Sequence, residues 1–192
     1  MTPGARPGSR LSVGDAAPAA VVLDVDGRPF DLASLWPHGP VLVVFLRHFG
    51  CIFCRELLAE LQERSAKLAQ AGLLVVAIGL GEPRHAQRIG GRLAPDITVL
   101  AAPTAAAYAA YGIVRASMMQ ILSPRTFAAG ARAALGGSVQ TQPTGDQQMV
   151  GGTFVVDRQG VVRFAHYDAF PGDKPDLDRI LALGRRLARR AA

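Results

Sequence analysis

The sequence predicts a single α/β domain in which a central mixed β-sheet is flanked by helices and preceded by an N-terminal β-hairpin. Residues 41–46 and 73–78 are continuous apolar runs, as expected of strands buried on both faces. Leucines recur at helical spacing between these runs. A strand, a helix and a strand within about forty residues form a βαβ unit, so the two strands are expected to be parallel.

The β-hairpin is expected ahead of the first buried strand. The apolar residues 21–23 are followed by Asp26-Gly27, a strong signal for a tight turn, and by a second short strand over residues 30–32. Gly39-Pro40 then breaks the chain before the apolar run begins.

The helix of the βαβ unit is expected to begin at Cys54 and to end at Gly72, which is a suitable C-terminal cap. Polar residues fall outside its apolar stripe, so one face is expected to pack on the sheet. That stripe consists of Leu57, Leu58, Leu61 and Leu68.

Further helices and strands alternate in the second half of the chain. Helices are predicted over residues 85–93 and 104–111, with a short strand over residues 97–100 between them. Another helix is predicted from Pro124 to the glycine pair that begins at Gly136. Residues 138–146 are polar and irregular, and are predicted to form a surface loop.

The chain is expected to end with a second β-hairpin and a helix. The hairpin strands are predicted over residues 152–157 and 161–166, with a turn between them. The helix is predicted to start at Asp173 or Pro175. Its core face consists of Leu177, Ile180, Leu181 and Leu187.

Composition supports one globular domain over residues 13–190, preceded by a disordered tail over residues 1–12. The chain has 192 residues, of which 49% are hydrophobic, which suffices for one buried core. The first ten residues lack the apolar stretch of a signal peptide, and no apolar run has the roughly 20 residues that span a bilayer. Two cysteines do not indicate a disulfide-stapled secreted scaffold. A cytoplasmic location without a membrane span is therefore expected.

The net charge of +6 comes mainly from arginines, several of which lie between residues 185 and 190. Aromatic residues make up only 6% of the chain, and no nucleic-acid-binding motif accompanies the positive charge. We therefore expect no nucleic-acid partner and interpret this cluster as the solvated end of a helix. An acidic partner or a membrane surface is the alternative.

The chemistry is expected at Cys51 and Cys54, between the end of a buried strand and the start of a helix. Amide groups at a helix N-terminus favour an anion, so a thiolate at this position is stabilised and its pKa falls. Arg47 and Arg55 add positive charge nearby, and His48 does so only when it is protonated. The Cys-x-x-Cys spacing allows the second thiol to close a disulfide after the first has reacted.

The two cysteines allow two other interpretations. Half of a zinc site is one, but no second cysteine pair or spaced histidine pair completes it, so neither a metal nor another cofactor is expected. Two inert buried cysteines are the other. Redox chemistry is favoured because of the strand, Cys-x-x-Cys and helix context.

Three segments give residues 14–181 a resemblance to the AhpC/TSA antioxidant group of the thioredoxin superfamily. They are Gly14-Asp15-Ala16-Ala17-Pro18, the run from Phe45 to Glu56, and the run from Gly151 to Asp157. More narrowly, the chain resembles the peroxiredoxin-like branch that includes prostamide/prostaglandin F synthase-like proteins. This resemblance implies a thioredoxin-like fold and thiol-dependent reduction of peroxides.

The same comparison exposes departures from the family pattern. Ordinary peroxiredoxins carry Pro-x-x-x-Thr-x-x-Cys, and this alignment places Cys54 at the peroxidatic cysteine, Cys51 at the threonine and Arg47 at the proline. The arginine that polarises bound peroxide in the family would fall at Gly151. Thioredoxins proper would make Cys51 the attacking thiol and Cys54 the resolving thiol, with Gly152 nearest to their cis-proline.

We expect Cys51 to be the nucleophile and Cys54 the resolving thiol, and we hypothesise that Arg47 replaces one missing partner of the developing oxyanion. Met118 and Met119 are expected to pack in the core rather than to line a substrate groove. His166 is expected to be structural. The residues expected to bind substrate or support the site are His48, Phe49, Arg55, Gly151, Gly152 and Thr153.

The expected function is reduction of a peroxide or another small oxidised substrate by the Cys51/Cys54 dithiol. An intramolecular disulfide forms, and an external thiol reductant such as thioredoxin restores the dithiol. A homodimer is compatible with the sequence. A protein disulfide reductase is the alternative function, and a non-catalytic binding module on the same fold is a second alternative.

Overall fold

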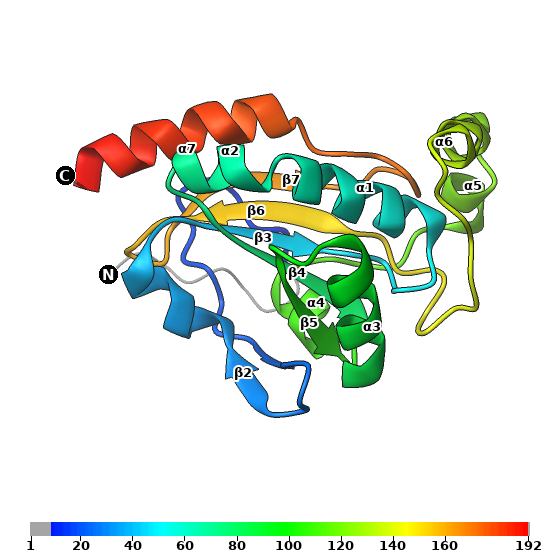
Figure 1. Cartoon of the computed structure of the whole chain (residues 1–192), viewed down its shortest axis with the longest axis horizontal. Helices are drawn as coiled ribbons and strands as arrows, with labels where there is room; N and C mark the ends of the chain where they lie inside the picture. Colours follow the sequence, from blue (N-terminus) through cyan, green and yellow to red (C-terminus); the bar gives the residue numbers. More distant parts are fainter. Residues whose placement is uncertain (1–8, 192) are drawn as a thin grey trace.

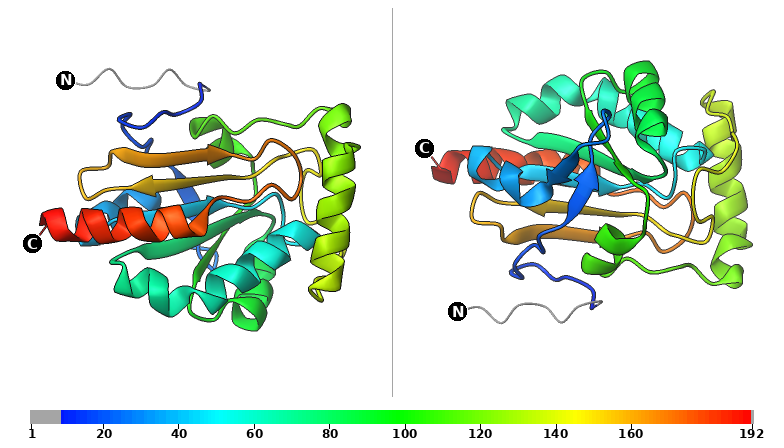
Figure 2. Two further views of the ribbon diagram at one scale, coloured as in Figure 1. Left: turned by 90° about the horizontal axis from the view of Figure 1, so that it is seen from above. Right: turned by 90° about the horizontal axis from the view of Figure 1, so that it is seen from below.

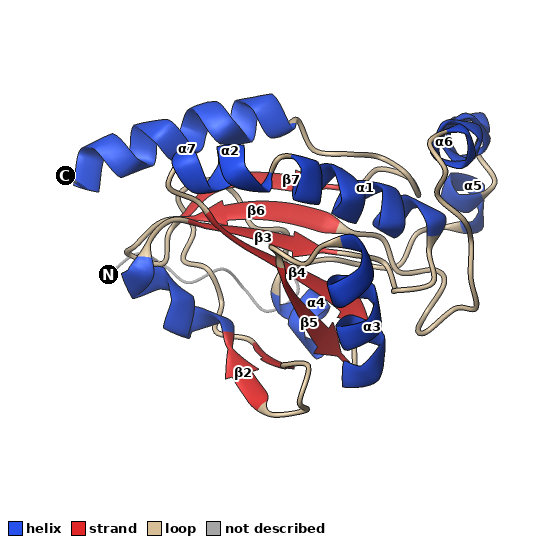
Figure 3. Cartoon of the chain, in the orientation of Figure 1, coloured by secondary structure: helices blue, strands red, loops and turns tan. Residues whose placement is uncertain are grey.

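The computed structural model describes residues 9–191 and contains a seven-stranded mixed sheet flanked by helices, which confirms the predicted fold class (Figure 3). The strands follow the order β2-β1-β5-β4-β3-β6-β7 across the sheet. The strands are β1 (Val21–Leu23), β2 (Pro29–Asp31), β3 (Val41–Phe45), β4 (Leu74–Leu80), β5 (Thr98–Ala102), β6 (Gly152–Val156) and β7 (Val162–Tyr167). The helices are η1 (Leu32–His38), α1 (Ile52–Glu63), α2 (Ser65–Gln70), α3 (Pro83–Leu93), α4 (Ala106–Ala110), α5 (Met118–Ile121), α6 (Pro124–Leu135) and α7 (Leu177–Ala191).

β3 is an interior strand of the sheet, and all its residues are buried. It pairs with β4 in parallel, as the βαβ pattern predicts, and with β6 in antiparallel orientation. Leu42 and Val44 belong to one core cluster, whereas Val43 and Phe45 belong to the cluster on the other face. Burial on both faces explains why this strand is a continuous apolar run instead of an alternating one.

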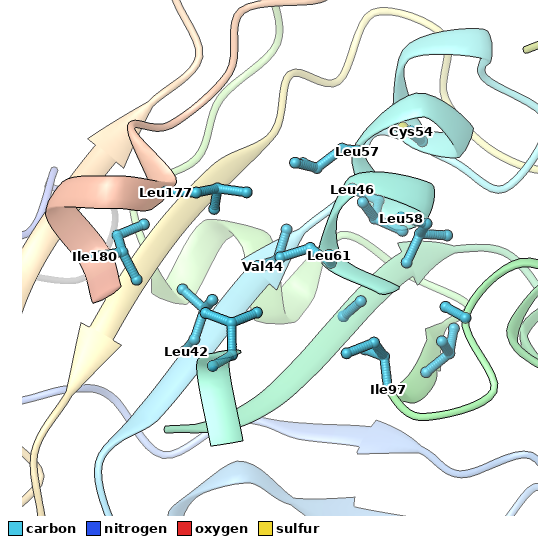
Figure 4. Packing of buried hydrophobic residues seen from close by; sticks show 14 of the residues in the cluster. Leu42, Val44, Leu46, Cys54, Leu57, Leu58, Leu61, Ile97, Leu177 and Ile180 are labelled. Atoms are coloured by element: carbon cyan, nitrogen blue, oxygen red, sulfur yellow. The ribbon is translucent and has the colours of Figure 1, made fainter. Parts of the chain in front are cut away.

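Helices cover both faces of the sheet. The first core cluster packs β3 against α1, α2, α3 and α7, and Figure 4 shows part of it around Val44 and Leu61. The second cluster lies under η1 and α4, where Trp36 and Tyr108 are buried. Figure 1 shows α1, α2 and α7 above the sheet and α4 below it. β3 is therefore buried between two helix-covered cores, one on each face of the sheet.

Several helix boundaries differ from the sequence-based expectation. The helix after β3 begins at Ile52 rather than at Cys54, and Arg64, with φ −98° and ψ 3°, separates α1 from α2. The last helix begins at Leu177, after the predicted start at Asp173 or Pro175. Leucine periodicity continues through Arg64, so a break in the backbone leaves no trace in that pattern.

A short helix, α5, was not predicted, and the expectation that its methionines pack in the core is wrong. Ser117 caps α5 by accepting a hydrogen bond from the backbone of Gln120. Met118 and Met119 are 58% and 85% exposed. A single helical turn buries too little surface to show an apolar stripe, which explains the error.

Part of the predicted N-terminal tail is described. Residues 1–8 lie outside the described residues. Leu11 is buried, and its backbone N–H donates to the hydroxyl of Tyr167 at 2.5 Å. The guanidinium carbon of Arg10 lies 4.8 Å from the centroid of the same ring. Residues 10 and 11 are thus attached to the last strand of the sheet.

α5 and α6 stand across the end of the sheet at which β3 ends (Figure 2). An ion pair between Arg132 of α6 and Glu56 of α1, with 3.0 Å between Nε and Oε1, joins the two helices. Lys174 bridges Glu56 and Glu60 from the segment before α7. Within residues 9–191 no helix has the length and apolar character needed to cross a membrane.

Candidate active site

Both cysteines lie at the start of α1, where β3 delivers the chain to the helix. Cys51 is the N-cap residue with an extended backbone (φ −75°, ψ 129°), and Cys54 lies in the first turn. Both are buried and unbonded to each other, and Cys54 lies at the edge of the core cluster near Leu46 and Leu57 (Figure 4). The helix start is two residues earlier than predicted, which puts the sulfur of Cys51 beside the free amide groups of the first turn.

The sulfur of Cys51 is surrounded by hydrogen-bond donors. The thiol of Cys54 donates to it, and the nearby guanidinium of Arg47 and the backbone N–H groups of Cys54 and Phe53 add to this effect. Burial opposes them, yet together they lower the pKa of Cys51 to about 6. Cys51 is therefore a thiolate at neutral pH.

Cys54 has the opposite character. Burial, its hydrogen bond to Cys51 and the charge on Cys51 raise the pKa of the Cys54 thiol well above its usual value. The backbone N–H of Arg47 donates to its sulfur at 3.2 Å. The pair thus combines one anionic sulfur with one protonated sulfur that faces it.

Arg47 is buried and held by backbone oxygens. Its Nε donates to the carbonyl of Met149 at 2.8 Å, and its Nη2 donates to the carbonyl of Gln147. The remaining nitrogen, Nη1, lies 3.4 Å from the sulfur of Cys51. Two neutral acceptors orient the guanidinium without neutralising it, so its charge acts on the thiolate.

His48 adds no positive charge at neutral pH. Burial and the neighbouring Arg47 lower its pKa to about 4, and Asp146 offsets only part of this shift. Its Nδ1 accepts a hydrogen bond from the backbone of Gly50 at 3.2 Å. The proton of the neutral ring is therefore on Nε2.

Residues 138–148 cover the cysteines, although the sequence indicated only a polar surface loop. The side-chain oxygen of Gln140 accepts from the backbone of Ile52 at 2.9 Å, and the backbone of Thr141 donates to the carbonyl of Gly50 at 3.0 Å. Thr144 accepts from the backbone of Phe49 and donates to the carbonyl of Leu80. Cys51 is only 1% exposed as a result of this enclosure.

Asp168, which follows β7, is a site residue that sequence reasoning missed. Burial, and then the neighbouring Asp173, raises the pKa of its carboxyl to about 8 against the opposing effects of the Gly151 amide and Arg47. Asp168 and Cys54 line one narrow cavity of about 20 Å³. The carboxyl is thus protonated at neutral pH and shares an enclosed space with the protonated sulfur.

Asp168 also explains why position 151 is a glycine. A Cβ on Gly151 would lie 2.5 Å from Oδ2 of Asp168 and 2.6 Å from the carbonyl oxygen of Phe45. No side chain fits there, so an arginine at this position is excluded by the packing. His166 lies beside the same carboxyl, with 3.5 Å between its Nε2 and Oδ1 of Asp168.

The remaining predicted site residues lie around the cysteines without contacting the sulfurs. Phe49 is buried, with its ring so close to Gly79 that a Cβ there would lie 2.6 Å from it. Gly152 and Thr153 pair with Phe45 and Val44 across the sheet. Arg55 lines a separate pocket between α1 and α3.

A cavity of about 580 Å³ adjoins Arg47 and His48 on the side of α5 and α6. Its lining combines polar and apolar side chains from both sides of the site. Among them are Arg47, His48, Phe53, Met118, Ile121 and Gln148. Among residues 9–191 no three His, Cys, Asp or Glu side chains gather in a way that would hold a metal ion.

The sequence of this chain is similar to those of known proteins. Residues 13–165 match the model of the AhpC/TSA family. The chain is 31% identical over 167 residues to the prostamide/prostaglandin F synthase of Sus scrofa. The matched region covers 82% of this chain and 79% of that protein. It is 32% identical over 113 residues to the chloroplastic thioredoxin-like protein AAED1 of Arabidopsis thaliana, which covers 58% of this chain and 46% of that protein, less than half of that relative's length.

A solved structure shares the fold at lower sequence identity. Peroxidoxin BcpB from Mycobacterium tuberculosis superposes with a TM-score of 0.69 at 19% identity, over 93% of this chain and 99% of that chain. The thioredoxin-like fold implied by the sequence motifs is confirmed by this likeness.

Proposed function

The chain belongs to the AhpC/TSA family, and from this premise we propose that it is a thiol-dependent oxidoreductase that reduces an organic peroxide through Cys51 and Cys54. The observation that supports this function most directly is the unequal state of the two sulfurs. Cys51 is a thiolate with Nη1 of Arg47 at 3.4 Å, and Cys54 is a protonated thiol beside it.

In the proposed first step, the Cys51 thiolate attacks the terminal oxygen of the hydroperoxide. The S–O bond forms as the O–O bond breaks, the sulfur is oxidised to a sulfenic acid, and the leaving alkoxide takes a proton from solvent to become an alcohol. Arg47 stabilises the negative charge that develops on this oxygen. Arg47 would thus take the role of the peroxide-polarising arginine of ordinary peroxiredoxins, which the packing around Gly151 excludes from position 151.

In the second step, the sulfur of Cys54 attacks the sulfenic sulfur of Cys51. The S–S bond forms, the hydroxyl leaves as water with the proton of Cys54, and an external dithiol such as thioredoxin returns the disulfide to two thiols. The protonated Asp168 carboxyl shares a cavity with Cys54, so it would relay this proton by releasing its own as it takes up that of the thiol.

The cavity beside α5 and α6 supports an organic peroxide as the substrate. A volume of about 580 Å³ is far larger than hydrogen peroxide needs, and the exposed Met118 and the ring of Phe53 provide apolar surface next to Arg47. Pockets for small organic ligands typically span about 300–1,000 Å³. The name of the Sus scrofa relative, prostamide/prostaglandin F synthase, agrees with a bulky substrate.

The test is a thiol count and an intact mass after one equivalent of cumene hydroperoxide, with hydrogen peroxide in a parallel sample. We expect loss of both thiols without added oxygen, and faster loss with the organic peroxide. Cys54→Ser should instead retain one oxygen on Cys51, and the double serine variant should not react. If neither the native protein nor the double variant reacted with either peroxide, the proposed function would be refuted. A non-catalytic binding module would then be the remaining interpretation.

Protein disulfide reduction is the second candidate function. It is favoured by the position of Cys51 at the N-cap with a lowered pKa, since the attacking thiol of a Cys-x-x-Cys pair has this character. Insulin reduction by the same preparation distinguishes the two functions. Reduction of insulin without consumption of either peroxide would make disulfide exchange the function.

A further inference from the structure

A second pocket, of about 380 Å³, lies behind the cysteines between α1, α3 and the segment around Thr141. Three arginines and a histidine line it, namely Arg55 from α1 and His85, Arg88 and Arg92 from α3. Arg88 and Arg92 are four residues apart, so they share one face of α3. The pocket is thus strongly positive and separate from the cavity beside α5.

Arg55 is the unusual member of this group. It is only 7% exposed, and its guanidinium makes no hydrogen bond or ion pair with any residue between 9 and 191. Burial, and then the charges of Arg92 and Arg88, lowers its pKa. Its guanidinium opens into the pocket beside two like charges, an arrangement that an anion bound there would stabilise.

The surrounding residues do not supply that anion. No Asp or Glu belongs to the lining, and Arg88 and Arg92 form no ion pair with any described residue. The nearest acidic groups of α1 are engaged elsewhere, because Glu56 and Glu60 pair with Arg132, Arg64 and Lys174. The positive charge of the pocket therefore remains available to a ligand.

His85 adds a neutral donor to the same wall. Its Nδ1 accepts a hydrogen bond from the backbone of Glu82 at 3.0 Å, so the ring proton is on Nε2. Burial and the neighbouring Arg84 and Arg88 lower its pKa, which keeps the ring uncharged. An N–H donor among guanidinium groups suits an oxygen-rich anion.

We infer that this pocket binds a small molecule with more than one oxyanion charge, carried by phosphate or carboxylate groups. Guanidinium groups bind both kinds of oxyanion through paired N–H donors. The volume suits a small metabolite rather than a polymer, and it lies near the lower end of the range for small-ligand sites, about 300–1,000 Å³. The proposal does not depend on the reaction at the cysteines.

Calorimetric titration of the whole protein with pyrophosphate, and separately with citrate, tests this site and distinguishes the two oxyanion chemistries. We expect saturable binding of at least one of them at one site per chain. Arg55→Gln and Arg88→Gln should each weaken it by about tenfold or more, since each removes a charge-assisted pair of hydrogen bonds. Circular dichroism verifies that both variants are folded.

Arg84→Gln is the matched control, because it removes the same charge from the same helix at a position outside the pocket lining. Its affinity should remain within about twofold of the native value, as expected for a screened charge at the surface. If Arg84→Gln and Arg88→Gln weakened anion binding equally, the binding would reflect only the general positive charge of α3. That result would overturn the proposed site. Absence of saturable binding of both anions would overturn it as well.

Discussion

Arg47 contacts both sulfurs of the pair, Cys51 through its side chain and Cys54 through its backbone. Nη1 lies 3.4 Å from the sulfur of Cys51, and the backbone nitrogen lies 3.2 Å from the sulfur of Cys54. A substitution at position 47 therefore removes the contact to the thiolate and keeps the contact to the buried thiol. Side-chain variants at position 47 therefore test the contact to Cys51 independently of the backbone contact to Cys54.

Arg47→Ala is expected to raise the pKa of Cys51 above about 6 and to lower peroxide turnover by about 10²-fold, as loss of one donor to a developing oxyanion does elsewhere. Arg47→Lys keeps the charge but loses the paired donors to the backbone. Its turnover should therefore lie between that of the native protein and that of Arg47→Ala. Ultraviolet absorbance of the thiolate against pH gives the pKa, and steady-state kinetics gives the turnover. Undiminished turnover of Arg47→Ala would contradict the role of Arg47 in the reaction.

The hydrogen bond from Cys54 is the largest influence that lowers the pKa of Cys51. Cys54→Ala removes this donor, so the midpoint of Cys51 alkylation against pH should move upward from about 6. Cys54→Ser retains a hydroxyl donor and should move the midpoint less. Alkylation with iodoacetamide over a pH series measures both, and identical midpoints for all three proteins would show that the donor is unimportant.

Asp168→Asn is expected to change how stability depends on pH. The folded pKa of about 8 exceeds the usual 3.8, so between these values the folded state holds a proton that the unfolded state has released. The contribution of Asp168 to the free energy of unfolding should therefore fall as pH rises through this window, by about 1.4 kcal/mol per pH unit at most, whereas the lowered pKa values of Cys51 and His48 act in the opposite direction. Asp168→Asn should abolish this fall, because asparagine stays neutral.

Urea unfolding at several pH values between 5 and 9, chosen to bracket the carboxyl's pKa of about 8, measures this effect. Asp173→Asn serves as a graded control, since Asp173 raises the pKa of Asp168. Its loss should lower the folded pKa of Asp168 and so shorten the pH range over which stability depends on this carboxyl, without abolishing the dependence. His166 and Arg47 also face this carboxyl, so their own substitutions are kept out of the series. The same slope in Asp168→Asn and the native protein would show that Asp168 is ionised in the fold.

Gln140→Ala is expected to expose Cys51 more often. It removes the bond from the side chain of Gln140 to the backbone of Ile52, which attaches the covering segment to the start of α1. Alkylation of Cys51 should become several-fold faster, since about 1 kcal/mol of a lost hydrogen bond shifts the opening equilibrium by that factor. The pH midpoint should stay unchanged.

Gln142→Ala is the matched control for that experiment, because the side chain of Gln142 on the same segment forms no hydrogen bond with residues 9–191. Its alkylation rate should equal that of the native protein. Equal acceleration by both substitutions would mean that the segment is loosened generally and that the bond to Ile52 has no special part.

The sequence predicted the elements whose signal is local. The apolar run of β3, the Asp26-Gly27 turn and the stripe that includes Leu57 and Leu61 each reflect burial or a turn within a few residues, and the structure has them where they were expected. The same locality made Arg47 predictable as a neighbour of the cysteines, because it shares their loop.

The remaining features of the site depend on segments that meet only in the folded chain. Asp168 reaches Cys54 because β6 pairs with β3 and β7 pairs with β6, and no pattern near position 168 encodes that path. Gln140 reaches Ile52 across 88 positions of the sequence. The burial that keeps His48 neutral is likewise a property of the assembled loop, so the charge of that side chain was unpredictable from its neighbours.

The contact between Gly151 and Asp168 makes these two positions epistatic. Substituting Gly151 with the arginine of ordinary peroxiredoxins would drive its Cβ into the carboxyl and into the carbonyl of Phe45. A smaller residue at position 168 would relieve only the first of these collisions. An arginine at position 151 therefore requires a coordinated shift of the β3 backbone, because a change at position 168 alone leaves the collision with Phe45.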